Sequence, residues 1–252
     1  MCGIAGVLRK SLQVSPQHLR NLAGAMAGTM YHRGPDDEGV WLSADNRVAL
    51  SHRRLSIIDT SSAGHQPMIG RDGQSALTYN GELYNFLEVK AELEAAGCKF
   101  KTKSDTEVFL AGLERWGPGA FSKFDAMFAI GHYDAVSRRL IIARDIFGEK
   151  PLYYVDTPEY FAFASELHAL TKLPGFDTSV TTDAIAAYLS FQYVPAPFTI
   201  YNAARKLPPG HWLMADENGK IHIERYFAFE TSAEKPAAGR SANLPTSLKI
   251  CS

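Results

Sequence analysis

Apolar positions change their spacing along the chain, and these changes predict where strands give way to helices. Residues 2–9, CGIAGVLR, form a short apolar run without proline, which predicts a buried strand. Ser15 is then placed to cap a helix that has Pro16 at its first position. Apolar residues follow at helical spacing and predict one buried face: Leu19, Leu22, Ala23, Met26, Ala27 and Met30.

Paired strands are predicted over much of the remaining sequence, where short apolar segments flank turn-forming residues. Such pairs are expected at 40–59, 126–145, 151–165 and 211–227. The last pair surrounds Asn218-Gly219, a strong two-residue turn signal. Residues 75–85, SALTYNGELYN, predict a strand that runs into a turn at Asn80-Gly81.

Three further helices are predicted. One is capped by Asn85 and stops near Gly97, another covers 104–116, and a short one covers 181–191. Ser104 and Glu107 form the S-x-x-E pattern of a capping box. Helices do not alternate strictly with strands, which disfavours a parallel Rossmann-type sheet and favours an α+β layered fold.

The composition changes near Thr231. Residues 231–252 are small, polar and punctuated by proline, which predicts a linker or a disordered tail. The folded domain is therefore expected to cover residues 2–230.

Composition narrows the classes of function. The 252 residues include 26 basic and 27 acidic side chains, so no basic surface for nucleic acid or an anionic membrane is expected. No apolar run approaches the roughly 20 residues that span a bilayer. The opening MCGIAGVLRK lacks the basic start of a signal peptide, so a cytoplasmic location is expected. Three cysteines, Cys2, Cys98 and Cys251, predict neither a disulfide framework nor a metal site.

Cys2 is the first candidate for chemistry. Removal of Met1 would leave one residue with both a thiol and a free α-amine, whose reference pKa values are about 8.5 and about 7.7–8.0. Such an amine can act as general base for its own side chain. The alternative is a small apolar residue that begins a buried strand, and the dipeptide by itself favours that alternative.

Several ordered motifs change this balance: YHRGPDDEG, SHRRLSIID, YNGELYN, SDTEV, RDIFGEKPLYY and ASELHAL. With them, the chain resembles the glutaminase domain of class II glutamine amidotransferases, which are N-terminal-nucleophile hydrolases. Within that class it is most similar to glutamine-hydrolysing asparagine synthetases, and residues 190–213 resemble the segment that leads toward their synthetase domain. The resemblance covers about residues 2–230 and implies a four-layer αββα sandwich of two antiparallel sheets flanked by helices.

The resemblance implies a role for each matching position. Cys2 matches the nucleophile, and Asn80 and Gly81 match the oxyanion hole. Arg54 matches the group that binds the α-carboxylate of glutamine. Glu82 and Asp105 match the groups that hold its α-ammonium. The same pocket is implied to be lined by Leu55, Ser56, Ile57 and Ile58.

The residue types suit these roles on chemical grounds. A zwitterionic substrate needs a cation for its carboxylate, and arginine offers a planar bidentate fork. Acyl transfer builds negative charge on the carbonyl oxygen, which needs preorganised donors. Each assignment has an alternative: Arg54 as a surface residue, Asn80-Gly81 as a hairpin turn, and Asp105 as a first-turn acid favoured by the helix dipole.

Other residues in the motifs are interpreted as structural. This group comprises His32, Arg33, Asp36, Asp37, His52 and His65, with Arg144, Asp145 and Gly148 expected to fix a turn and Cys98 expected to pack. An α-amine base makes a catalytic histidine unnecessary.

The pyrophosphate-binding SGGxDS motif of the synthetase domain is not found in the sequence. The chain is therefore interpreted as a fragment, the product of a truncated gene, or a subunit whose synthetase is a separate chain. The leading hypothesis is hydrolysis of L-glutamine to glutamate and ammonia, without a cofactor of its own, for a synthetase domain or subunit that uses ATP and Mg²⁺. The alternatives are a non-catalytic glutamine-binding or protein-interaction module and the glutaminase half of another amidotransferase.

Overall fold

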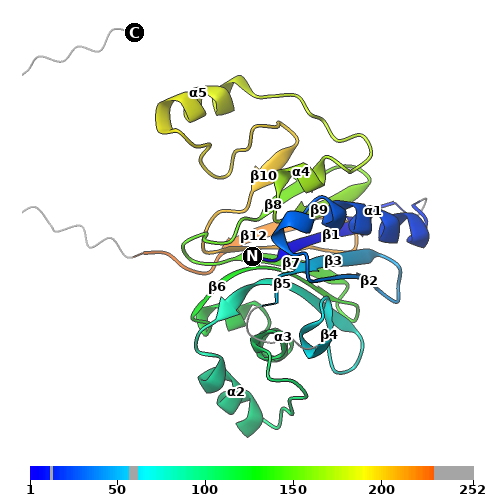
Figure 1. Ribbon diagram of the computed structural model, residues 1–252, viewed down its shortest axis with the longest axis vertical. Helices are drawn as coiled ribbons and strands as arrows, with labels where there is room; N and C mark the ends of the chain where they lie inside the picture. Colours follow the sequence, from blue (N-terminus) through cyan, green and yellow to red (C-terminus); the bar gives the residue numbers. More distant parts are fainter. Residues whose placement is uncertain (12–13, 57–61, 230–252) are drawn as a thin grey trace, which may run out of the picture.

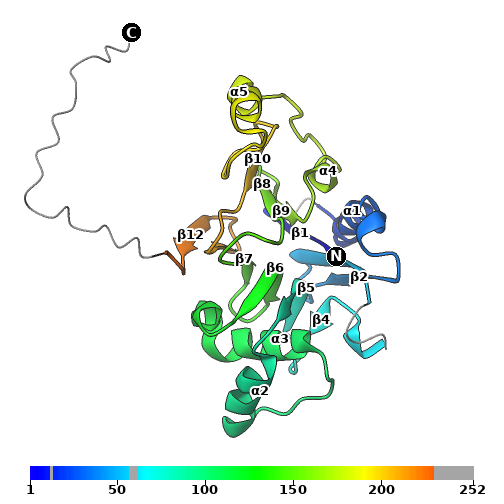
Figure 2. The ribbon, with the colours of Figure 1, turned by 60° about the vertical axis from the view of Figure 1, so that its left-hand side comes forward.

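Two antiparallel sheets form the centre of the protein, as seen in the computed structural model, which describes residues 1–11, 14–56 and 62–229. Figures 1 and 2 show the sheets between outer helices. In spatial order the first sheet contains β10 (Ala204–Lys206), β8 (Tyr153–Asp156), β9 (Tyr160–Ala164), β1 (Gly3–Arg9), β3 (Val48–Arg54) and β2 (Asp37–Leu42). The second contains β12 (Ile221–Arg225), β11 (His211–Ala215), β7 (Arg139–Arg144), β6 (Ala126–Asp134), β5 (Ser75–Leu83) and β4 (Met68–Ile69).

Helices cover the outer faces of both sheets. Against the first sheet pack α1 (Pro16–Gly28) and the short α4 (Leu167–Leu170), which the sequence did not predict. Against the second pack α2 (Phe86–Ala95) and α3 (Asp105–Trp116). The remaining helix is α5 (Thr182–Phe191), and three 3₁₀ turns are η1 (Tyr31–Arg33), η2 (Ser62–Gly64) and η3 (Gly117–Ser122). The predicted α+β fold with four αββα layers is confirmed.

Three apolar layers follow from this stacking. Alternate residues of β1 illustrate it: Ile4 and Leu8 face the second sheet, whereas Ala5 and Val7 face α1. All four are buried, which explains why β1 reads as a continuous apolar run. The sequence of β1 therefore specifies a strand covered on both faces.

The ring of Phe163, on β9, packs closely against two glycines, one in each sheet. Its ring would lie 2.4 Å from a Cβ at Gly6 on β1 and 2.0 Å from a Cβ at Gly131 on β6. The two glycines therefore make room for one aromatic ring between the layers.

The predicted helix ends are correct in position, but two of their capping interactions differ. Ser15 and Ser104 cap α1 and α3 through their hydroxyls, as expected. The carboxylate of Glu107 instead accepts from the backbone of Lys101 and Thr102, so the capping box does not close. Asn85 precedes α2, but its side chain makes no cap. Its amide bonds to Lys123 and Asp125 and ties α2 to the loop after η3.

Asn80 and Gly81 are not in a turn, contrary to the sequence prediction. Strand β5 continues to Leu83, with Asn80 opposite Ala129 and Gly81 opposite Phe128 on β6. Pairing with a long neighbouring strand overrides the local turn preference of Asn-Gly.

The predicted tail at 231–252 and the end of the strand pair at 40–59 lie wholly or partly outside the described residues. The limits of the domain at 2 and 230 therefore stay a prediction. Among the described residues, no helix has the length and apolar character needed to cross a membrane.

Candidate active site

Cys2 lies immediately before β1, a central strand of the first sheet, and borders a pocket of about 240 Å³. Its sulfur is 3.5 Å from the backbone nitrogen of Leu55, which follows β3. Since β1 and β3 pair from Gly3 opposite Arg53 onward, the sheet itself brings Cys2 beside residues 54–55. The thiol is half-buried and faces a cavity that a small molecule can enter.

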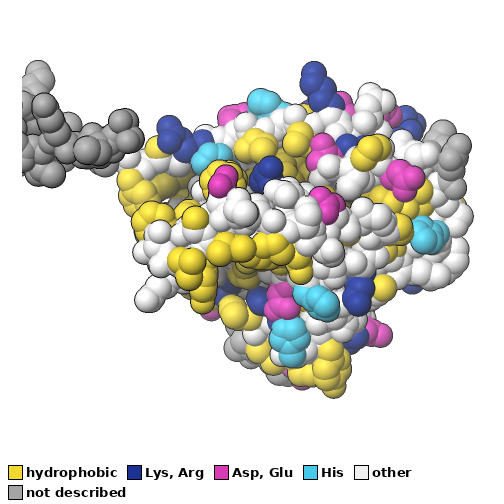
Figure 3. Space-filling model, turned by 90° about the horizontal axis from the view of Figure 1, so that it is seen from above, with side chains coloured by type: hydrophobic (Ala, Val, Ile, Leu, Met, Phe, Trp, Pro, Cys, Tyr) yellow, Lys and Arg dark blue, Asp and Glu magenta, His cyan; other side chains and the backbone are white. Residues whose placement is uncertain are grey.

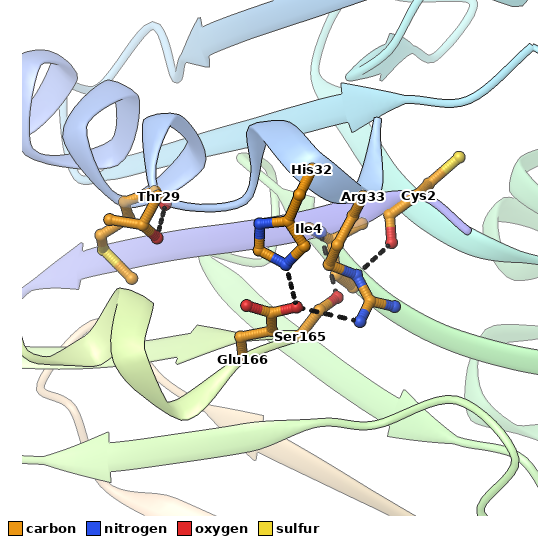
Figure 4. A network of polar contacts seen from close by, with 8 residues as sticks. Cys2, Ile4, Thr29, His32, Arg33, Ser165 and Glu166 are labelled. Carbon is orange, nitrogen blue, oxygen red and sulfur yellow. Dashed lines mark hydrogen bonds and ion pairs between the residues drawn. The ribbon is translucent and has the colours of Figure 1, made fainter. Parts of the chain in front are cut away.

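Arg33 holds the backbone of Cys2, and Glu166 from a distant segment holds Arg33 (Figure 4). Arg33 Nε donates to the carbonyl of Cys2 at 2.9 Å, and Arg33 Nη1 lies 3.2 Å from Glu166. His32 contacts the same carboxylate at 2.8 Å. Next to it, the Ser165 hydroxyl accepts from the backbone of Ile4 at 3.1 Å. The start of β1 is therefore held in place through its backbone.

The edge of β5 presents a row of backbone donors, because alternate residues of a strand direct their N–H groups to the same side. The N–H of Tyr79 donates to Gln66 at 2.7 Å, and that of Leu83 donates to Asp105 at 3.0 Å. The N–H of Gly81 lies between them and has the same direction. It points away from β6, and the described residues provide it with no acceptor.

Asn80 supplies a second free donor beside Gly81. Its side chain is buried, and its Nδ2 has no hydrogen-bond partner among the described residues. Because buried polar groups are nearly always paired, two adjacent donors without partners mark a place prepared for an acceptor. A Cβ at Gly81 would lie 2.4 Å from the carbonyl oxygen of Met127, so only glycine fits there.

Arg54 ends β3 and is nearly buried in the wall of the pocket. Its guanidinium lies against Gly64 of η2, where a Cβ would be 2.0 Å from Nη2. The neighbouring backbone is tied to Asp36, whose N–H donates to the Arg54 carbonyl and whose carboxylate accepts from Ser56. The HRGPDD motif therefore shapes this side of the pocket through its backbone contacts.

Asp105 begins α3 and places a half-buried carboxyl on another wall. Burial raises the pKa of this carboxyl, while the hydrogen bonds from the Leu83 N–H and the Tyr79 hydroxyl act in the opposite direction. Burial also raises the pKa of Tyr79, which therefore stays protonated and donates to Asp105. Glu82 on β5 lines the same pocket.

The structure brings most of the predicted site residues to this one pocket. Its lining includes Cys2, Arg54, Leu55, Asn80, Gly81, Glu82 and Asp105, which come from the segment before β1, from β3 and the residue after it, from β5 and from α3. Ser56 is not part of the lining. Ile57 and Ile58 lie outside the described residues. The catalytic and binding roles of all these residues stay predictions.

Sequence reasoning missed several residues that form or support the pocket. Gln66, Met127 and Lys150 line it, and Glu166 holds Arg33, whose expected structural role proves to be a hydrogen bond to the Cys2 carbonyl. The local sequence gives no chemical signal for Gln66 or Met127. Arg33 and Lys150 occur within the motifs YHRGPDDEG and RDIFGEKPLYY, so only those motifs pointed to them.

The turn after β7 behaves as predicted. Asp145 is fully buried and accepts from the backbone N–H groups of Phe147, Glu149 and Lys150. Arg144 donates to the carbonyl of Gly148, which has a φ of 69°. Together these contacts place Lys150 at the pocket.

His52 and His65, the two histidines that could be mistaken for a catalytic base, make structural contacts. Burial lowers the pKa of His52 to about 4, and its Nε2 lies 3.1 Å from the Tyr79 carbonyl oxygen. His65 pairs with Asp37 at 2.8 Å. Cys98 is partly buried against the α3 core, as expected. Among the described residues, no group of His, Cys, Asp and Glu has the arrangement needed to hold a metal ion.

Comparison with known proteins gives a consistent result. The family model of the glutamine amidotransferase domain matches residues 1–227. Asparagine synthetase [glutamine-hydrolyzing] 1 of Bacillus subtilis is 38% identical over 227 residues, which cover 90% of this chain and 35% of that protein. A putative asparagine synthetase of Methanocaldococcus jannaschii is 32% identical and is covered over 48% of its length. This chain therefore spans between about a third and a half of these relatives.

A solved structure supports the fold. Glutamine phosphoribosylpyrophosphate amidotransferase from B. subtilis matches 90% of this chain and 49% of its own, with a TM-score of 0.64 and 20% sequence identity. At that identity the likeness concerns the fold alone. The family match over nearly the whole chain, together with the relatives, shows that this chain belongs to the class II glutamine amidotransferase family.

Proposed function

We propose that this chain hydrolyses L-glutamine to L-glutamate and ammonia through a thioester on Cys2. One observation carries the proposal. The thiol shares a small pocket with a buried arginine, two carboxylates and two donors, Asn80 Nδ2 and the Gly81 N–H, that have no acceptor among the described residues. Family membership supports a glutamine substrate.

The charges of the pocket match a zwitterionic amino acid. In this proposal, Arg54 binds the α-carboxylate and Asp105, assisted by Glu82, binds the α-ammonium. Binding both charged groups directs the side chain of the substrate toward Cys2, because Arg54 and Asp105 lie on walls of the same cavity.

The reaction then needs a nucleophile, a base and an oxyanion site. The Cys2 thiol gives its proton to the Cys2 α-amine, and its sulfur attacks the side-chain amide carbon of glutamine. The carbonyl oxygen becomes an oxyanion that accepts from Asn80 Nδ2 and the Gly81 N–H. Collapse breaks the C–N bond, and the leaving nitrogen takes the proton from the amine and departs as ammonia. Water attacks the resulting γ-glutamyl thioester, which restores the thiol and gives glutamate.

Removal of Met1 is part of this mechanism, because only then is the α-amine on Cys2. In the unprocessed chain Met1 is exposed and borders the pocket, so it is accessible for removal. Hydrolysis needs no cofactor in this scheme.

We propose a synthetase domain or subunit as the acceptor of the ammonia, with ATP and Mg²⁺ bound there, and aspartate converted to asparagine. The names of the relatives, and the part of their length that this chain does not cover, support this acceptor. A cytoplasmic location belongs to the same proposal. A binding module without catalysis is the alternative, and the enzyme is favoured by the two donors at Asn80 and Gly81, which lack an acceptor within residues 1–11, 14–56 and 62–229.

The test is to incubate the purified chain with glutamine and to measure glutamate and ammonia. Equal amounts of both are expected, without dependence on ATP or aspartate. Cys2→Ala is expected to abolish turnover while glutamine still binds in calorimetry. The intact mass of the active protein should correspond to a chain that begins at Cys2. Full activity in a chain that retains Met1 contradicts the α-amine mechanism, and glutamine binding without turnover in the processed chain supports the binding module.

A further inference from the structure

Residues 180–201 form an arm that projects from the body of the protein and carries α5 (Figures 1 and 2). Its two ends are tied together by a bridge between Val180 and Tyr201. The N–H of Thr181 donates to the Ile200 carbonyl at 3.1 Å, and Tyr201 packs edge-on against Phe176. The α5 arm therefore has a fixed base and a helix at its far end.

The far end of the α5 arm exposes large apolar side chains. On α5, Ile185, Tyr188 and Leu189 are 44%, 56% and 76% exposed and have the i, i+3, i+4 spacing of one helix face. The end of the helix and the segment after it add further exposed residues: Phe191, Tyr193 and Phe198. Figure 3 views the molecule from this side and shows hydrophobic side chains gathered on it.

Charge is missing from this part of the sequence. Residues 184–204 contain no Asp, Glu, Lys or Arg. Of the residues of α5, Ala184 is the buried one. A helix of 10 residues is marginal in water without packing, and contiguous exposed apolar surface marks an interaction site. The α5 arm therefore has the composition of a surface that another protein surface covers.

The chemistry of the arm selects among possible partners. A helix that lies on a membrane needs Lys or Arg on its polar face, and α5 has neither. Uncharged, aromatic-rich surfaces are typical of permanent contacts rather than transient ones. The match to the B. subtilis asparagine synthetase covers 90% of this chain and only 35% of that protein. About two thirds of that relative therefore lies outside the match, within the same polypeptide. This additional portion could form a permanent contact with the arm.

We propose that the α5 arm docks into an apolar groove on the ATP-using synthetase portion that receives the ammonia. This inference rests on the proposed function for the identity of the partner. Docking would hold the glutaminase pocket and the synthetase portion in one orientation, so that ammonia made at Cys2 is used rather than released.

The experiment uses a full-length chimera, in which residues 1–227 of this chain replace the matching part of the B. subtilis asparagine synthetase. The ratio of asparagine formed to glutamate formed is measured with glutamine, aspartate, ATP and Mg²⁺. A ratio near one is expected. Leu189→Glu should lower it by about tenfold, because burying an unpaired carboxylate costs at least the roughly 1.4 kcal/mol that corresponds to tenfold. Glutamate formation should stay unchanged.

The matched control is Leu87→Glu on α2, where the replaced leucine is 65% exposed. Its ratio should equal that of the parent chimera. Synthesis of asparagine from added ammonia shows in every variant that the synthetase portion is folded. An unchanged ratio in Leu189→Glu overturns the proposal. So does a parent chimera that hydrolyses glutamine and uses added ammonia but never couples the two reactions.

Hydrogen exchange separates failure of docking from failure of the proposed function. Amides of α5 should exchange at least about tenfold more slowly in the chimera than in the separate chain, and Leu189→Glu should remove this protection. Protection without any glutamine hydrolysis supports docking and contradicts the proposed function. If the separate chain instead forms dimers that Leu189→Glu dissociates, and α5 is equally protected in both proteins, the occupant is a second copy and the proposal is wrong.

Discussion

Helices α3 and α5 have similar lengths and similar beginnings, but their surroundings are opposite. Each starts at a side-chain cap, Ser104 for α3 and Thr181 for α5. Helix α3 buries most of its residues against the second sheet and presents Asp105 to the pocket. Helix α5 buries one residue and leaves its large apolar side chains exposed. Local signals therefore specify that a helix forms, whereas the neighbouring layers decide whether its apolar face is covered.

The first test of this comparison is Phe109→Ala in α3, which is expected to have the largest effect on stability. Phe109 is fully buried, and its ring packs 4.9 Å from Tyr79, 4.3 Å from Phe124 and 5.2 Å from Phe128, measured between centroids. Loss of these contacts should lower the free energy of unfolding by about 3–5 kcal/mol, as for other buried phenylalanines. Urea denaturation measures this change. A loss below about 1 kcal/mol would mean that α3 is not packed as described.

The second test asks whether activity belongs to the strand beneath α3 and not to the arm. Asn80→Ala should lower kcat by about 10²–10³, the usual cost of one oxyanion donor. Asn202→Ala at the base of the arm is the matched control and should leave kcat unchanged, since its side-chain amide donates to the Ser179 hydroxyl and does not line the pocket that contains Cys2. Steady-state kinetics with glutamine measure both. Normal turnover in Asn80→Ala would remove Asn80 from the oxyanion site.

The third test uses pH, because the two regions differ in buried ionisable groups. Burial lowers the pKa of His132, on the α3 face of β6, to about 4, with Asp134 acting weakly in the opposite direction. Its ordinary value is near 6.5, so between pH 6.5 and 4 the unfolded chain binds a proton that the folded protein excludes. Stability contributed by neutral His132 is therefore complete above pH 6.5 and decreases as the pH falls, by up to about 1.4 kcal/mol per pH unit.

His52 has the same lowered pKa and should add a similar slope. His132→Leu should remove the part of the pH dependence of stability that His132 contributes. It also removes two ring nitrogens that lack partners among the described residues. Denaturation in urea at pH 6.5, 5.5 and 4.5 measures the slope. An unchanged slope in His132→Leu would show that His132 titrates normally.

The smallest effect on the free energy of unfolding is expected for a substitution in the α5 arm. Leu189→Ala should change the free energy of unfolding of this chain by no more than about 0.5 kcal/mol, because the leucine is 76% exposed and packs against little. Urea denaturation beside Phe109→Ala gives the direct comparison. A loss comparable to that of Phe109→Ala would show that the arm is already covered in this chain.

The sequence by itself determined the elements whose signals are local. The periodicity of β1 and α1, the caps at Ser15 and Ser104, and the strand pairs of both sheets were predictable, because each depends on residues close in the chain. The resemblance of its motifs also indicated Cys2, Arg54, Asn80, Gly81, Glu82 and Asp105 as one site. The spacing of these residues did not show that they meet, since they are separated by up to about a hundred positions.

The tertiary structure decided what depends on distant partners. Pairing with β6 keeps Asn80-Gly81 in a strand, and the edge of that strand leaves the Gly81 N–H, between two occupied neighbours, with no acceptor in the part of the chain that the structure describes. Arg33 reaches the carbonyl of Cys2, and Glu166 reaches Arg33, only because folding brings these distant segments together. The exposure of α5 was equally invisible, since burial is a property of neighbouring layers. Local propensity extends over a few residues, whereas burial and free donors are set by chain segments that meet only after folding.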